Sequence, residues 1–143
     1  QKNSFSLGEF EVKGIPVSLN NILIPVFAIG CETDHIAAWK DSYRGVQLMG
    51  SEEKKFILAE SGHIAGIINP PAKNKYGYYL NQNLTLDSES WRRKASHISG
   101  SWWPEWEKWI NSYSGNQVEA RKEGSTIYPP LSDAPGSYVL KKS

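Results

Sequence analysis

The sequence has 143 residues, of which 16 are Lys or Arg and 15 are Asp or Glu, so its formal net charge at pH 7 is +1. A chain of this length buries about two-thirds of its unfolded surface, which is enough for one domain. Hydrophobic residues make up 39% and charged residues 22%, which argues against intrinsic disorder. The near-neutral charge provides no electrostatic attraction for nucleic acid or an anionic membrane surface, and we expect neither as a partner.

Cysteine usage and the start of the chain bear on the compartment and the completeness of the protein. The single cysteine, Cys31, cannot form a disulfide framework or a Cys-rich zinc site, and the three histidines are far apart. We therefore expect no metal site, and a reducing, cytoplasmic compartment. The sequence has no recognisable signal peptide and no run of ~20 apolar residues that could span a membrane. Because it begins with Gln1 rather than Met, we expect a fragment of a longer protein.

The first half of the chain carries the pattern of one βαβ unit. Alternating apolar residues over 10–15 predict a short strand or an extended arm. The apolar run 23–29 predicts a strand buried on both faces, as in parallel sheets. Apolar residues three or four positions apart over 36–46 predict an amphipathic helix that ends near Gly50, and residues 56–59 predict a second strand. The order strand, helix, strand indicates an α/β fold.

The second half of the chain is less regular. Residues 64–79 are rich in Gly, Pro, Asn and Tyr and predict an ordered surface loop. A helix is expected over 87–97, and a second helix with an aromatic face over 102–113. Pro and Gly beyond Gly115 predict an irregular tail. Because no repeat or linker is found, the whole chain, residues 1–143, is expected to form a single domain segment.

Each predicted strand is followed by a turn with a titratable residue, Asp34 after the first and His63 after the second. Ligands bind outside the carboxyl ends of the strands in open α/β sheets, which is where both turns lie. On adjacent parallel strands, such an Asp and His come within hydrogen-bond reach. The Asp then fixes the imidazole tautomer while the other ring nitrogen takes a proton. The alternative is a turn-forming Asp whose side chain binds its own backbone, together with a histidine that only packs.

The nucleophile that such a pair would activate is missing. Cys31 lacks the sharp turn with small flanking residues that a nucleophile of this fold requires, as in G-x-S-x-G, and we interpret it as a packing or lining residue. No serine lies in such a motif either, because Ser101 is followed by two tryptophans. From its residues alone, the chain holds an acid and a base without the atom that they would activate.

Four segments resemble the C-terminal end of polyhydroxyalkanoate synthases, and most closely of those that polymerise short (R)-3-hydroxyacyl groups. They are residues 32–39 (ETDHIAAW), 61–75 (SGHIAGIINPPAKNK), 100–106 (GSWWPEW) and 134–139 (APGSYV), in that order across nearly the whole chain. The sequence departs from the family at Ala38, where proline is usual. We expect this change to loosen the start of the following helix slightly and to leave the chemistry unaltered.

The resemblance implies an α/β-hydrolase-like fold of which this chain is only the C-terminal portion, with parallel strands, flanking helices and an incomplete sheet. It also implies a Cys-Asp-His triad in which Asp34 and His63 are the catalytic Asp and His, while the nucleophilic cysteine lies outside this chain. The implied reaction transfers the acyl group of an (R)-3-hydroxyacyl-coenzyme A thioester to a growing polyester and releases coenzyme A. Coenzyme A is then part of the substrate, no cofactor is expected, and the implied location is the cytoplasm, at polyester granules.

Several other residues have two interpretations each. His35 would contact substrate or assist proton transfer, or else it caps the following helix or packs. Lys73 and Lys75 would attract the phosphates of coenzyme A, or else they form a solvated basic loop. The tryptophans of residues 102–113 would line an acyl path, although aromatic stripes at helical spacing more often pack in a core, which we favour. His97 is assigned no role.

Two other functions stay open at this point. A thioesterase or polyester depolymerase of the same fold would use the same acid and base with an upstream serine. A non-catalytic piece would contribute only folding or self-association. Because an incomplete sheet leaves apolar strand faces uncovered, we expect the chain to pair with the N-terminal part of the same catalytic domain, and the isolated chain to form a homodimer.

Overall fold

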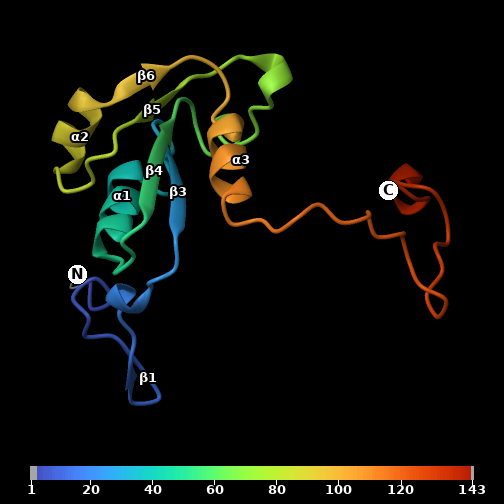
Figure 1. The fold of residues 1–143 in the computed structure, drawn as a ribbon, viewed down its shortest axis with the longest axis horizontal. Coiled ribbons are helices and arrows are strands. Elements are labelled where there is room, and N and C mark those ends of the chain that lie inside the picture. The colour runs from blue at the N-terminus through green and yellow to red at the C-terminus, as the bar shows by residue number, and fades with distance from the viewer. Residues whose placement is uncertain (1–2, 143) are drawn as a thin grey trace. The chain divides into compact units, whose positions relative to one another are not determined.

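The computed structural model describes residues 3–142, and the contacts within it divide the chain after Tyr113 into two units (Figure 1). The first unit contains the β-strands and the α-helices. The second, from Ser114 on, is mostly irregular backbone with a few turns and bends and a short 3-10 turn, η3 (Tyr138–Leu140). The irregular tail predicted beyond Gly115 is thus confirmed, and the single domain segment stays a prediction.

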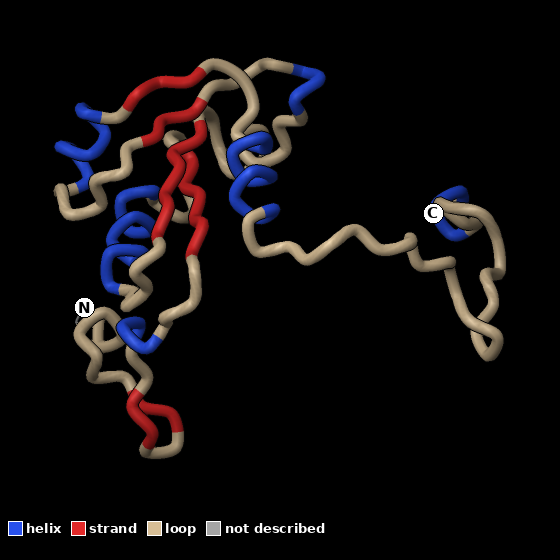
Figure 2. Tube along the Cα trace, viewed as in Figure 1, coloured by secondary structure: helices blue, strands red, loops and turns tan. Residues whose placement is uncertain are grey.

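A four-stranded sheet in the order β3-β4-β5-β6 forms the centre of the first unit (Figure 2). Its strands are β3 (Val26–Cys31), β4 (Lys54–Ala59), β5 (Tyr78–Leu80) and β6 (Ser96–Ile98). Strands β3 and β4 are parallel and joined by α1 (Trp39–Leu48), as the βαβ pattern predicted, whereas β5 and β6 run antiparallel to their neighbours. The prediction of strands with flanking helices is confirmed, but a purely parallel sheet is wrong because the sheet is mixed.

The mixed topology follows from the connection between β4 and β5. A parallel return requires a crossover that runs back along the strand, usually as a helix. The connection over 60–77 instead holds a short 3-10 turn, η2 (Pro71–Lys73), and joins the adjacent ends of the two strands, so β5 runs in the opposite direction. The loop predicted over 64–79 is confirmed for most of its length, but its last two residues, Tyr78 and Tyr79, belong to β5.

The helix predicted over 87–97 begins where expected and ends early. Asp87 caps α2 (Ser88–Lys94), because its side chain accepts a hydrogen bond of 2.9 Å from the backbone N–H of Ser90. The chain becomes extended at Ala95, and β6 follows at once. His97 therefore lies in a strand, opposite Tyr79 of β5, rather than at the end of a helix.

Two apolar clusters lie on opposite faces of the sheet. Side chains along β4 alternate between these faces. Phe56 and Leu58 pack against α1 and α2, whereas Ile57 and Ala59 pack against Trp102 at the start of α3 (Trp103–Asn111). Figure 1 shows α1 and α3 on the two sides of β3 and β4. The strand predicted over 56–59 is therefore the one that is buried on both faces.

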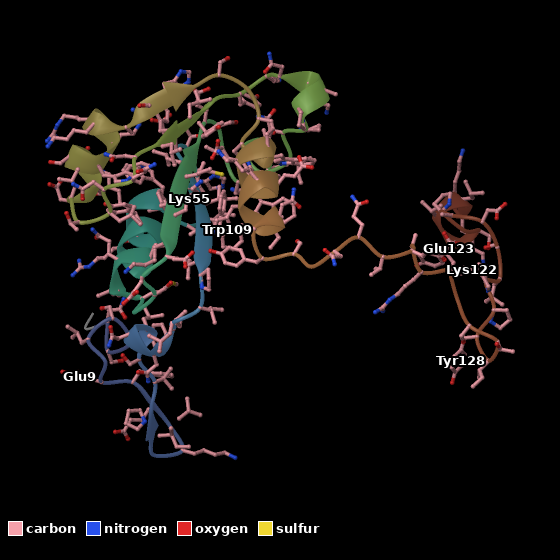
Figure 3. All side chains as sticks on the ribbon, viewed as in Figure 1. Glu9, Lys55, Trp109, Lys122, Glu123 and Tyr128 are labelled. Carbon is pink, nitrogen blue, oxygen red and sulfur yellow. The ribbon has the colours of Figure 1, made fainter. Side chains whose placement is uncertain are left out.

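Strand β3 lies at the edge of the sheet and is less covered. Only Gly30 and Cys31, at its carboxyl end, are buried, so burial of this strand on both faces is not seen within residues 3–142. Its α3 side is covered in part by Trp109, whose ring centroid lies 5.3 Å from that of Phe27. Figure 3 labels Trp109 and the neighbouring Lys55 of β4, which forms an ion pair of 3.2 Å with Glu105 of α3.

The amino-terminal part of the first unit is a small hairpin. Strands β1 (Glu11–Val12) and β2 (Ile15–Pro16) pair antiparallel, which confirms the short strand predicted over 10–15. The turn between them has φ of 51° at Lys13 and 76° at Gly14, as two-residue hairpin turns require. A 3-10 turn, η1 (Leu19–Asn21), leads on toward β3. No helix within residues 3–142 is long and apolar enough to cross a membrane.

Candidate active site

The turns after β3 and β4 lie side by side because the two parallel strands end in register, with Cys31 opposite Ala59. Two backbone hydrogen bonds continue the ladder beyond the strands, from Glu32 N–H to the Ala59 carbonyl at 2.8 Å and from Thr33 N–H to the Ser61 carbonyl at 3.1 Å. The two predicted site residues follow directly after this joined backbone. His63 and Asp34 are 29 positions apart in the sequence, and Nδ1 of His63 lies 3.2 Å from Oδ1 of Asp34.

The Asp34 carboxylate organises its own turn as well as contacting the histidine. Its Oδ1 accepts hydrogen bonds from the backbone N–H groups of Ile36 at 2.8 Å and Ala37 at 3.1 Å. These two N–H groups, and then His63, hold the pKa of Asp34 below its usual value. The carboxylate is therefore charged at neutral pH. Both interpretations of Asp34 apply, since it binds its own backbone and also contacts the imidazole.

His63 is oriented on one side and accessible on the other. An ionised Asp34 favours the tautomer with a proton on Nδ1, which leaves Nε2 as the ring's acceptor. Within residues 3–142, Nε2 makes no hydrogen bond, and the side chain is 34% exposed. The ring of His35 is the neighbour of the His63 ring, with centroids 5.3 Å apart. A charged Asp on Nδ1 and an open Nε2 are what a general base requires.

Cys31 is close to this pair but is not an exposed nucleophile. The residue is 3% exposed, and its sulfur packs so closely on Gly66 that a Cβ there would lie 2.9 Å from Sγ. Burial, and then the charge of Asp34, raises the pKa of the Cys31 thiol above its usual value. A thiol of this kind remains protonated and unreactive at neutral pH. The interpretation of Cys31 as a packing residue is therefore confirmed.

The loop that carries His63 is fastened to α3 by two tryptophans. The indole N–H of Trp102 donates to the Gly66 carbonyl at 2.8 Å, and that of Trp103 donates to the Ile67 carbonyl at 2.9 Å. Beside these contacts is an open, mostly apolar cavity of about 440 Å³. Both Trp102 and Trp106 line this cavity, but Trp102 is buried whereas Trp106 is 45% exposed. The expected packing role is therefore right for Trp102 and wrong for Trp106.

Comparison with characterised proteins gives matches over nearly the whole chain. It is 42% identical over 133 residues to poly(3-hydroxyalkanoate) polymerase 2 of Ectopseudomonas oleovorans, covering 92% of this chain and 24% of that protein. It is 38% identical over 137 residues to the poly(3-hydroxyalkanoate) polymerase subunit PhaC of Cupriavidus necator, covering 95% of this chain and 23% of that protein. The subunit PhaC of Rhizobium etli is 36% identical over 142 residues, which are 99% of this chain and 22% of that protein. The chain is thus related to the poly(3-hydroxyalkanoate) polymerases.

This relationship confirms the resemblance inferred from the four motifs. No family model matches the chain. The chain spans about a quarter of the length of these polymerases and corresponds to their C-terminal part.

Within residues 3–142, no three His, Cys, Asp or Glu side chains are grouped as ligands for a metal ion.

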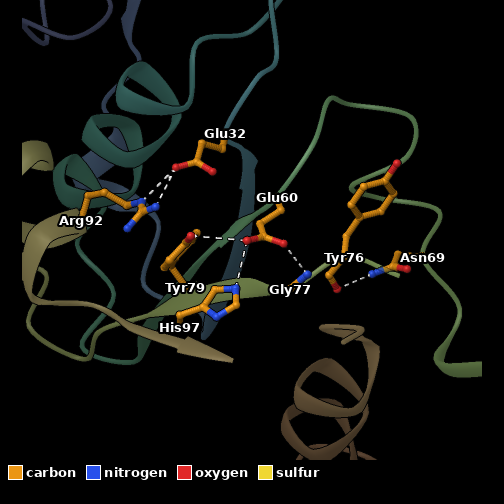
Figure 4. A network of polar contacts seen from close by, with 8 residues as sticks. All are labelled: Glu32, Glu60, Asn69, Tyr76, Gly77, Tyr79, Arg92 and His97. Atoms are coloured by element: carbon orange, nitrogen blue, oxygen red, sulfur yellow. Dashed lines mark hydrogen bonds and ion pairs between the residues drawn. The ribbon is translucent and has the colours of Figure 1, made fainter. Parts of the chain in front are cut away.

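A polar network also lies beside the Asp34–His63 pair. The sequence pattern did not reveal this network. It consists of Glu32, Glu60, Gly77, Tyr79, Arg92 and His97 (Figure 4). His97, which was assigned no role, contacts Glu60 with Nε2 at 2.9 Å from Oε1. The signal available in the sequence was a Glu directly after each strand, but their partners come from β5, β6 and α2, whose pairing was not predicted.

The two predicted lysines are not joined to the Asp34–His63 pair by any contact within residues 3–142. Lys73 lies in η2, and Lys75 lies over the ring of Tyr76 with Nζ 5.0 Å from its centroid. Their contact with coenzyme A phosphates stays a prediction, as does contact of His35 with substrate. Ala38 is the N-cap of α1 and makes no side-chain cap, as expected for a residue without a polar side chain.

Proposed function

We propose that this chain acts as the C-terminal part of the catalytic domain of a polyhydroxyalkanoate synthase. The reaction transfers the acyl group of an (R)-3-hydroxyacyl-coenzyme A to the hydroxyl end of a growing polyester, with release of coenzyme A. The observation that carries the proposal is the contact of 3.2 Å between Nδ1 of His63 and Oδ1 of Asp34. The sequence relationship to poly(3-hydroxyalkanoate) polymerases supports the choice of this reaction over others that use an Asp–His pair.

The proposed roles of the two residues are supported by their geometry. Nε2 of His63 takes the proton of a cysteine thiol that lies outside this chain, and the thiolate attacks the thioester carbonyl. Coenzyme A leaves as the thiol once it has received a proton, and the acyl group stays on the cysteine. In elongation, the same nitrogen, with the help of Asp34, takes the proton of the attacking 3-hydroxyl. The new ester bond forms as the bond between the acyl group and the cysteine sulfur breaks, and the cysteine thiolate receives the proton. Asp34 holds the ring and stabilises the imidazolium in both steps. His35, next to the His63 ring, contacts the substrate.

The fold supports a partner for the first unit. Strand β3 has a neighbour on one edge only within residues 3–142, and its amino-terminal half is partly exposed. An exposed edge of this kind pairs with another strand. We propose that the N-terminal part of the same α/β-hydrolase-like domain pairs with β3, and that the isolated chain dimerises through this surface. The assembled enzyme acts in the cytoplasm at the surface of polyester granules.

The test uses the full-length protein that carries this chain, with (R)-3-hydroxybutyryl-coenzyme A as substrate. Release of coenzyme A and the fate of the acyl group are measured together. The wild type is expected to release coenzyme A and form polyester, and His63→Ala is expected to lower the rate by about 10²–10⁴-fold, the value of one positioned proton transfer. Glu89→Ala is a matched control, because Glu89 forms an exposed ion pair with Lys40 away from the site. Its rate should equal that of the wild type.

Other outcomes lead to different conclusions. Release of free 3-hydroxybutyrate without polymer would assign the chain to a hydrolase, in which water replaces the 3-hydroxyl as acceptor. A His63→Ala variant with the wild-type rate would overturn the proposed role of the pair.

A further inference from the structure

The loop that carries His63 is closed at its base by one side chain. The backbone N–H of Glu60 donates to the Gly77 carbonyl at 3.0 Å, and the Gly77 N–H donates to Oε2 of the Glu60 side chain at 2.7 Å. These two hydrogen bonds join the residue before the loop to the residue that precedes β5. His63 is three residues from Glu60, so the position of Glu60 limits where the imidazole can lie.

The second carboxylate oxygen of Glu60 is fixed as well. Its Oε1 lies 2.9 Å from Nε2 of His97 and accepts a hydrogen bond of 3.4 Å from the Tyr79 hydroxyl (Figure 4). The Gly77 N–H, and then His97 and Tyr79, hold the pKa of Glu60 below its usual value. The approach of His97 depends on Gly77, because a Cβ there would lie 2.5 Å from Nε2 of that histidine. The Glu60 carboxylate is therefore a charged group with little freedom to move.

The same network reaches the turn that carries Asp34. Glu32, two residues before Asp34, accepts hydrogen bonds on Oε1 from Nε of Arg92 at 3.1 Å and from Nη2 at 2.8 Å. The guanidinium of Arg92 stacks on Tyr79, with Cζ 3.3 Å from the ring centroid. Tyr79 in turn donates to Glu60. A continuous chain of contacts thus links the two turns through α2 and β5. Within residues 3–142, no hydrogen bond or ion pair joins a member of this chain of contacts to Asp34 or His63.

We infer that Glu60 is a positioning residue that sets the approach of His63 to Asp34 through this polar network. The inference rests on the proposed function, since it concerns the same acid–base pair. Glu60 acts at the base of the His63 turn, and Arg92 acts on the opposite turn through Glu32. A shift of about 1 Å between groups that transfer a proton lowers a rate by about 10²-fold. Loss of the Glu60 side chain therefore reduces the rate of acyl transfer and leaves substrate binding unchanged.

The test compares Glu60→Ala and Glu60→Gln in the full-length protein. Release of coenzyme A from (R)-3-hydroxybutyryl-coenzyme A is followed in a single turnover, with enzyme in saturating excess. Under this condition, unfolded molecules do not change the rate constant, so a merely structural role would not move it. Glu60→Ala is expected to lower this rate constant about 10- to 100-fold, while KM, measured separately in the steady state, stays within twofold of the wild type. Glu60→Gln, which keeps an oxygen for the Gly77 N–H, is expected to restore most of the rate.

Two further variants make the outcome decisive. Glu89→Ala, which removes an exposed carboxylate from α2 outside the network, should keep the wild-type rate constant. If Glu60→Ala fails to fold, Arg92→Met replaces it, because Arg92 is a partly exposed member of the network, and it should lower the rate constant about tenfold. The inference would be overturned if Glu60→Ala had the wild-type rate constant. If Glu60→Ala does not fold, the wild-type rate constant in Arg92→Met would overturn it. A Glu60→Gln variant as slow as Glu60→Ala would also overturn it.

The failure of this inference and that of the proposed function are distinguishable. If His63→Ala is inactive while the network variants are fully active, the acid–base pair stands and the positioning role of Glu60 falls. If His63→Ala is as active as the wild type, the proposed function itself falls.

Discussion

Cys31 and Ala59, the last residues of β3 and β4, lie directly opposite each other in a parallel pair. Asp34 follows the first by three positions and His63 follows the second by four, so the two turns start from one level of the sheet. Backbone hydrogen bonds join these turns before either site residue is reached. The geometry of the Asp34–His63 pair is thus a consequence of strand register.

Asp34 makes the protein sensitive to acid. Its pKa is lower in the folded chain than in the unfolded one, mainly because the Ile36 and Ala37 N–H groups bind the charged form. The stabilisation is therefore complete above the unfolded pKa of about 3.9 and is lost as the pH falls through the lower folded value. We expect Asp34→Asn to lower the denaturation midpoint at pH 7. At low pH, the difference in midpoint between this variant and the wild type should become smaller, because Asp34 of the wild type is then protonated. Asp133→Asn, in the exposed second unit, should show no such trend. A pH-independent loss in Asp34→Asn would contradict this account.

Gly77 is expected to tolerate no side chain. A Cβ there would lie 2.5 Å from Nε2 of His97 and 2.6 Å from the Ile98 carbonyl. We expect Gly77→Ala to lower the free energy of unfolding by about 1–3 kcal/mol, the cost of overpacking. The matched control is Gly45→Ala, because Gly45 lies inside α1 with nothing within 4 Å of its Cβ position. That variant should gain about 0.5–1 kcal/mol. Denaturant unfolding measures both, and equal effects would refute the steric argument.

Cys31 is expected to be unreactive in the native protein. Because it is 3% exposed and its pKa is raised by burial, we expect alkylation by iodoacetamide in the unfolded protein and not in the native one. Mass spectrometry of a peptide containing Cys31 measures the difference. Cys31→Ala should cost on the order of 1 kcal/mol of stability through the small cavity it leaves, with turnover retained. Rapid native alkylation, or loss of turnover in a folded Cys31→Ala protein, would mean that the thiol takes part in the chemistry.

Ala38 is expected to accept proline, the residue that the resemblance to polyhydroxyalkanoate synthases implies at this position. Its φ of −55° lies within the range of proline, and its N–H donates no hydrogen bond within residues 3–142. We expect Ala38→Pro to raise the free energy of unfolding by about 0.4–1 kcal/mol, because it restricts the unfolded chain. The neighbouring Ala37→Pro is the contrast, since the Ala37 N–H donates to Asp34 and proline would remove it. If Ala38→Pro and Ala37→Pro are stabilised alike, the hydrogen bond from the Ala37 N–H to Asp34 does not contribute to the stability of the fold.

The sequence predicted the part of the fold that rests on local pattern. Continuous apolar residues predicted most of β3 and most of β4, and residues spaced three or four apart predicted α1 and α3. The pair of Asp34 and His63 was predictable because parallel neighbours place the ends of their strands together. What failed was long-range pairing. Strands β5 and β6 have three residues each, which is too short for a periodic signal, and the direction of β5 depends on the loop over 60–77.

The same reason explains the site residues that were missed. Glu60 and His97 are 37 positions apart and meet only because the short strand β5 pairs with β4 on one side and with β6 on the other. Nothing in the local sequence of either residue indicates this contact. Trp106 was assigned to the core from helical spacing, which identifies the apolar face of α3 but not whether other side chains cover all of it.

The account depends on His63 as the group that moves the proton, and chemical rescue tests this most directly. In the full-length protein, His63→Gly removes the ring and leaves Asp34 in its turn. Release of coenzyme A from (R)-3-hydroxybutyryl-coenzyme A is then measured with and without added imidazole. We expect the variant to be slower than the wild type by about 10²–10⁴-fold and to recover activity in proportion to the imidazole concentration. A His63→Gly protein with the wild-type rate in the absence of imidazole would contradict the account.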